Sequence, residues 1–151
     1  MSIDQVGAEF ASRMAAVRVS AGAETDLGAK VYRGLRKIND DMIPCCVIVE
    51  GAATSADGDS AADVQLSAPI AVQAYVPCDP ANPNVAAHAA LRDMKRAIWP
   101  TVNGRVELRL GSRVPSLAFG SQDIAPRADG AAFVLAVLHV EVEIAEDLSN
   151  P

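Results

Sequence analysis

The chain has 151 residues, half of them apolar, with a formal net charge of −6 and an isoelectric point near 4.8. That length suits one domain with a single core. The acidic balance is unfavourable for gripping phosphates, and an aromatic content of only 4% argues against base stacking, so specific nucleic-acid binding is not expected.

The sequence carries no sign of a membrane or export segment. No apolar run reaches the roughly 20 residues that a membrane helix needs, and residues 1–10 lack the basic and apolar parts of a secretory signal. The three cysteines are odd in number and two are adjacent, which favours synthesis in a reducing cytoplasm over a disulfide framework. We therefore expect no membrane partner.

The first half of the chain predicts a helix and about three strands, the first of them the short segment K-V-Y-R-G at 30–34. Residues 3–17 carry apolar side chains at spacings of three and four, as in an amphipathic helix. The apolar run at 43–51 suits a strand buried on both faces. Residues 53–63 are small, polar and acidic, and predict a mobile loop. The strand at 64–76 alternates dry and wet positions, and Pro69 predicts an edge position or a bulge within it.

The second half begins with a well-marked helix at residues 84–99. Asn84 is the expected cap, and Pro100 prevents continuation. Residues 105–110 alternate strictly, which predicts a strand with Val106, Leu108 and Leu110 pointing inward and Arg105, Glu107 and Arg109 pointing outward.

Two more extended segments, at 116–130 and 133–147, complete the chain. The predicted fold is a single α+β domain over residues 1–151. It has a mostly antiparallel mixed sheet of about five to six strands, packed against two helices at residues 3–17 and 84–99.

Catalytic and metal-binding motifs are absent from the sequence. There is no glycine-rich phosphate loop, G-x-S-x-G or H-E-x-x-H. Cys45, Cys46, Cys78 and His88 could be imagined as zinc ligands, but adjacent cysteines on a strand diverge and no C-x-x-C pair anchors them. His88 and His139 fit boundary positions better than catalytic bases. We expect no enzyme activity, no cofactor and no metal.

Exposed charges near strand ends offer candidates for a protein interface. Alternating charges on a strand are usually a solubility feature and less often match a partner surface. The candidate interface groups are Arg105, Arg109, Arg113 and Arg127.

Several segments carry a resemblance to a known family. They are K-V-Y-R-G (30–34), N-D-D-x-I-P-C-C-V-I-V-E-G (39–51), I-x-V-Q-A-Y-V-P-C-D-P-x-N-P-N-x-A-A-H-x-x-L-x-D-M-K-R-A-I (70–98), I-A-P-R-A-D-G (124–130) and A-E-D-L-x-N-P (145–151). This pattern of elements and turns resembles the tail terminator (tail completion) proteins of tailed phages and prophages.

The resemblance implies a structural virion protein without enzymatic activity. Such a subunit forms a homohexameric ring on the last ring of the tail tube protein, stops tube polymerisation, and presents a docking face to the head–tail connector or neck protein. It is assembled in the host cytoplasm and resides in the tail or neck of the virion. DNA passes through such a ring without specific binding, and a net negative charge would suit that lumen.

Three other functions stay open at the level of sequence. One is another head–tail joining (neck) protein, with the same acidic composition and ring habit. The second is a small cytosolic ligand-binding α+β domain with a pocket under the 84–99 helix. The third is a hydrolase that uses Cys78 or His88.

Overall fold

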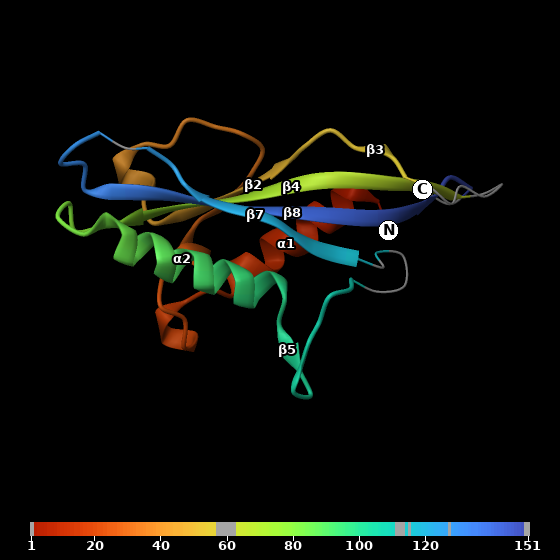
Figure 1. The fold of residues 1–151 in the computed structure, drawn as a ribbon, viewed down its shortest axis with the longest axis horizontal. Helices are drawn as coiled ribbons and strands as arrows, with labels where there is room; N and C mark the ends of the chain where they lie inside the picture. Colours follow the sequence, from red (N-terminus) through yellow and green to blue (C-terminus); the bar gives the residue numbers. More distant parts are fainter. Residues whose placement is uncertain (1, 57–62, 111–113, 115, 127, 150–151) are drawn as a thin grey trace.

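The computed structural model describes residues 2–56, 63–110, 114, 116–126 and 128–149. In these residues two α-helices pack on one face of a six-stranded sheet (Figure 1), which confirms the predicted α+β class. The helices are α1 (Ile3–Ala15) and α2 (Pro83–Ile98). Neither described helix is long and apolar enough to cross a membrane.

The sheet has the order β1-β2-β4-β8-β7, with β3 beside β4. The strands are β1 (Val31–Arg33), β2 (Cys45–Glu50), β3 (Thr54–Ser55), β4 (Asp63–Pro77), β7 (Ser116–Ile124) and β8 (Phe133–Asp147). β1 runs parallel to β2, and every other pairing is antiparallel. The 15-residue strands β4 and β8 pair along their whole length and form the centre of the sheet.

The helix α1 follows from its sequence closely and ends two residues before the predicted limit. Ser2 and Gln5 form a capping box: Ser2 Oγ accepts from Gln5 N at 3.3 Å, and Gln5 Oε1 accepts from Ser2 N at 2.8 Å. Its stripe of Val6, Phe10 and Met14 is fully buried. This stripe holds α1 against the sheet.

The helix α2 begins one residue earlier than predicted, and the assignment of Asn84 as its cap is wrong. Pro83 occupies the start of the helix, where its fixed φ suits a helix and its missing N–H costs nothing. Asn84 therefore lies inside the first turn, and Asn82 takes the cap position without a side-chain hydrogen bond. The apolar stripe of α2, formed by Ala87, Leu91, Met94 and Ile98, is buried.

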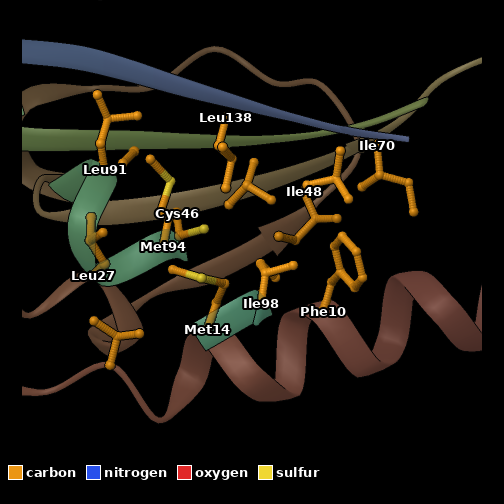
Figure 2. Close-up of a cluster of buried hydrophobic side chains, with 14 of the residues drawn as sticks. Phe10, Met14, Leu27, Cys46, Ile48, Ile70, Leu91, Met94, Ile98 and Leu138 are labelled. Carbon is orange, nitrogen blue, oxygen red and sulfur yellow. The ribbon is translucent and has the colours of Figure 1, made fainter. Parts of the chain in front are cut away.

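One core lies between the helices and the sheet (Figure 2). Phe10 and Met14 of α1 belong to one buried cluster with Ile48 of β2, Ile70 of β4 and Leu138 of β8. Leu91, Met94 and Ile98 of α2 extend the same cluster. In β2, four consecutive residues (Cys45–Ile48) are buried, which confirms a strand covered on both faces.

Pro69 does not lie on an edge strand, because β4 is interior to the sheet. It falls where β4 changes partners: β2 pairs with Ile70–Tyr75, and β3 pairs with Leu66–Ser67. Gly51 N donates to Pro69 O at 2.8 Å across this interval. The proline thus lies at the break between the β2 and β3 ladders, where its missing N–H removes no regular pairing, while the register with β8 runs on through it.

The prediction of one strand over residues 105–110 is also wrong: of the three residues expected to point inward, Leu110 is buried but Val106 and Leu108 are exposed. Only Arg105–Val106 (β6) is extended, and it pairs with β5 (Thr101–Val102) in a separate two-stranded hairpin. Asn103 and Gly104 both have positive φ (50° and 74°), as an Asn-Gly hairpin turn requires. This turn pairs the two short strands with each other and not with the six-stranded sheet. Val106 and Leu108 are therefore more than half exposed.

The predicted mobile loop at residues 53–63 is partly ordered by pairing. Thr54 and Ser55 form β3 against β4, and Ala56 N donates to Gln65 O at 2.8 Å. Residues 57–62 lie outside the described part of the chain. Mobility of this segment, like the extent of the domain over the whole chain, stays a prediction.

Candidate assembly surface

The strand β7 forms one edge of the sheet. β8 pairs with one side of it, and on the other side Leu117 N donates to Leu108 O at 2.9 Å. Among the described residues no other strand pairs with this side, and residues 118–123 are exposed. An open strand edge presents backbone donors and acceptors that another chain can use.

A bulge shapes this edge between Phe119 and Ser121. A Cβ on Gly120 would lie 3.0 Å from His139 O, so the close approach of the two strands favours glycine there. A bulge increases the local twist and re-aims neighbouring side chains. Phe119 is 53% exposed just before it.

Trp99 connects the end of α2 to β7. Its Nε1–H donates to Leu117 O at 2.7 Å, and its ring lies 6.4 Å from that of Phe119 at an interplanar angle of 53°. This tilted geometry is a favourable one for aromatic pairs. Trp99 therefore fixes the start of β7 relative to the helix.

A groove of about 710 Å³ opens between α2, the hairpin and β7. Its apolar lining includes Trp99, Val106, Leu108 and Phe119. Lys95, Arg96 and Arg109 contribute cations to its border. The groove is lined by Lys95, Arg96, Trp99, Thr101, Val106, Leu108, Arg109, Ser116, Leu117, Ala118 and Phe119.

The structure places two of the four predicted interface arginines in this region. Arg105 lies on β6 of the hairpin, and Arg109 borders the groove; both are exposed. Neither forms an ion pair within the part of the chain that is described. Arg113 and Arg127 lie outside the described residues. An interface role for all four stays a prediction.

Sequence reasoning missed the aromatic part of this surface. Trp99 reads only as a helix end, and Phe119 as one residue of a weak strand. A usable signal exists in the order Trp-Pro followed by Asn-Gly, which ends a helix and forms a hairpin turn within six residues. No pattern in the sequence reports that Phe119 meets Trp99.

The residues considered for catalysis do not come together. Cys78 is half-buried, and its Sγ lies 3.8 Å from Ala131 O in a hollow beside the start of α2. His88 is exposed and borders a different hollow, next to Gln122 and Asp123. Cys78 and His88 therefore do not form a nucleophile–base pair in this structure.

Cys45 and Cys46 are buried on opposite faces of β2. Burial raises the pKa of both thiols, which disfavours the thiolate needed for reactivity or metal binding. Across the described residues no three His, Cys, Asp or Glu side chains gather as a metal site.

Asp93 is a buried charge on α2, and it is fully satisfied. Its carboxylate accepts from Thr25 N at 2.7 Å, Thr25 Oγ1 at 2.6 Å and Glu24 N at 3.2 Å. Arg92 grips Glu24 through two hydrogen bonds of 2.8 Å, which lowers the pKa of that carboxyl. These contacts fix the loop after α1 to the polar side of α2, which is a structural role.

Comparison with known proteins finds a similar structure but no similar sequence. No protein-family model matches the sequence, and a search of curated proteins finds no match. Among solved structures, the chain is similar to one described as "Virion of native gene transfer agent (GTA) particle". The TM-score is 0.59 at 14% identity, over 93% of this chain and 95% of that one. The shared fold therefore extends over nearly the whole of both chains.

Proposed function

We propose that this chain is a structural virion protein, and specifically a tail terminator. It would form a ring that caps the tail tube, stops tube polymerisation and provides the docking surface for the head-side connector. The observation that carries this proposal is the fold shared, nearly end to end, with a chain from a gene transfer agent virion. The resemblance of segments in residues 30–151 to tail terminators supports the finer role.

The candidate assembly surface supports a role that depends on contacts between proteins. An exposed edge strand beside an apolar groove is costly to leave open in a monomer, because both features invite association. Val102, Val106, Leu108 and Phe119 each expose about half of their surface in this one region. A partner chain would bury them.

A structural role in assembly agrees with the chemistry of the described cysteines and of His88. The buried thiols have raised pKa values, and Cys78 and His88 border separate hollows. As a tail terminator, the protein would act in the virion tail or neck, after assembly in the host cytoplasm, with itself, the tail tube protein and the neck protein as partners.

The experiment is size-exclusion chromatography with light scattering, carried out with and without purified tail tubes of the same particle, followed by measurement of tube lengths. A terminator binds tube ends and limits further growth. A protein that joins other neck components leaves tube length unaltered while binding the connector. A persistent monomer that neither binds tubes nor limits their growth contradicts the proposal, and a monomer that binds a metabolite in the groove favours the ligand-binding alternative.

A further inference from the structure

Two exposed carboxylates lie on the face of the sheet that the helices leave uncovered. Even-numbered residues of β8, from Val134 to Ile144, are buried toward the helices, so the odd-numbered Glu141 and Glu143 point to the opposite face. Both are exposed, and neither has an ion-pair partner in the described chain.

The cross-strand neighbours of these carboxylates are small, and His139 is the next residue along β8 on the same face. Glu141 lies between Pro69 and Ala118 in the sheet, and Glu143 lies between Ser67 and Ser116. We call these six residues the acidic sheet face: Ser67, Pro69, Ser116, Ala118, Glu141 and Glu143.

A complementary surface lies on the other side of the same edge strand. Residues 101–109, which we call the hairpin arm, extend beyond the end of α2 on the helix side (Figure 1). The arm exposes apolar side chains together with Arg105 and Arg109, and the single acidic residue between them is Glu107. Its net charge is positive, because two arginines outnumber one glutamate.

The hairpin arm of one molecule cannot contact the acidic sheet face of the same molecule. Leu117 is buried on the helix side of β7 and Phe119 meets Trp99 there, whereas the residue between them, Ala118, belongs to the acidic sheet face. The basic, apolar arm and the acidic face thus lie on opposite sides of β7. Their unpaired charges have opposite sign, which is the basis for choosing an occupant.

We propose that the hairpin arm of one copy docks on the acidic sheet face of a second copy, with Arg105 and Arg109 facing Glu141 and Glu143. The inference rests on the proposed ring. Each copy carries one arm and one acidic face, so the contact is head-to-tail and uses both surfaces of every subunit. Such a heterologous contact closes into a ring when its rotation allows.

Charge reversal tests this contact on the intact chain. One variant carries Arg105→Glu and Arg109→Glu, a second carries Glu141→Arg and Glu143→Arg, and a third carries all four changes. All substitutions are at exposed positions, so each variant should fold, which circular dichroism checks. The matched control, Arg18→Glu with Lys37→Glu, reverses two charges that belong to neither surface.

Self-association is measured by sedimentation velocity over a concentration series at low salt, with tail tubes present as a template in a parallel series. Each two-residue variant should associate at least about 100-fold more weakly than the wild type, because like charges then face each other. The four-residue variant and the control should assemble. An equal mixture of the two-residue variants should also assemble, as an alternating ring with an even number of copies.

The outcomes separate this inference from the proposed function. If the wild type forms rings and both two-residue variants form them equally well, the arm-to-face contact is wrong and the ring proposal stands. Loss of assembly in the two-residue variants without rescue in the four-residue variant or in the mixture also overturns the pairing. A wild type that never associates, with or without tubes, overturns the proposed function and the contact together.

Discussion

Gly28 and Gly7 both lie in crowded places, but different groups surround them. A Cβ on Gly28 would lie 2.5 to 2.7 Å from the backbone oxygens of Met14, Ala15 and Val17. At Gly7 the nearest atoms belong to the side chains of Arg33 and Glu50, whose ends can move. The backbone cannot yield at Gly28 without opening the turn after α1.

We therefore predict that Gly28→Ala destabilises the protein by about 3 kcal/mol, the upper end of ordinary overpacking costs. Gly7→Ala should change stability by less than about 1 kcal/mol, because a better helix former offsets a weakened, partly exposed ion pair. Urea unfolding followed by circular dichroism measures both. Equal losses for the two variants would show that backbone crowding at Gly28 is not decisive.

At the scale of elements, the loop between α1 and β1 is held to α2 by charge as well as by Asp93. Arg92 is the largest cause of the lowered pKa of Glu24, with Arg96 contributing more weakly. A carboxyl whose folded pKa lies below its ordinary value of 4.5 stabilises the fold above that pH. The stabilisation is lost as the pH falls through the lower, folded value.

Replacing Glu24 with Gln should accordingly lower the thermal midpoint slightly at pH 6 and make no difference at a pH well below 4. Thermal unfolding of both proteins between pH 6 and 3 provides the comparison. High salt should reduce the difference at pH 6, since the pair is exposed. A gap between the two proteins that stays constant across the pH range would contradict the assignment.

Trp99 is the element-level link between α2, the hairpin and the edge strand. Trp99→Phe keeps an aromatic ring but removes the donor to Leu117 O, so the half-buried end of β7 loses one hydrogen bond. We expect a stability loss of about 1–2 kcal/mol and weaker self-association. Tyr75→Phe, which removes a hydroxyl away from the groove, is the control. If the two variants unfold and associate indistinguishably, the hydrogen bond from Trp99 does not stabilise the fold or the assembly surface.

The elements themselves were predictable to different degrees. Both helices and the strands β4 and β8 follow from periodicity, because each has a buried stripe or face that repeats along many residues. The strand β2 follows instead from an unbroken apolar run. The alternation in residues 105–110 misled, because a local Asn-Gly turn outweighs a pattern of only six residues. The periodicity of a strand does not identify the strands that pair with it, so the interior position of Pro69 could not be predicted.

The candidate surface was harder to predict than the fold for the same reason. Arg105 and Arg109 could be chosen from exposure alone, and the structure adds the groove beside them. Trp99 and Phe119 come from a helix end and an edge strand that only tertiary packing brings together. Contacts between distant segments, and between separate copies, lie beyond what periodicity reports.

At the scale of the whole molecule, the acidic chain has two unlike surfaces on opposite sides of one edge strand. A subunit of this kind can contact a neighbour on each side and still leave the rest of its surface to other partners. The proposed ring follows from that arrangement together with the fold shared with a virion chain. In the proposed ring, the net negative charge of the subunits would also keep DNA from adhering as it passes through the lumen.

The most direct measurement is electron microscopy of tail tubes from the same particle after incubation with the purified protein. The account predicts a ring of six copies at one end of each tube, and tubes that no longer elongate when fresh tube protein is added. Bare tube ends that continue to grow at saturating protein would contradict it.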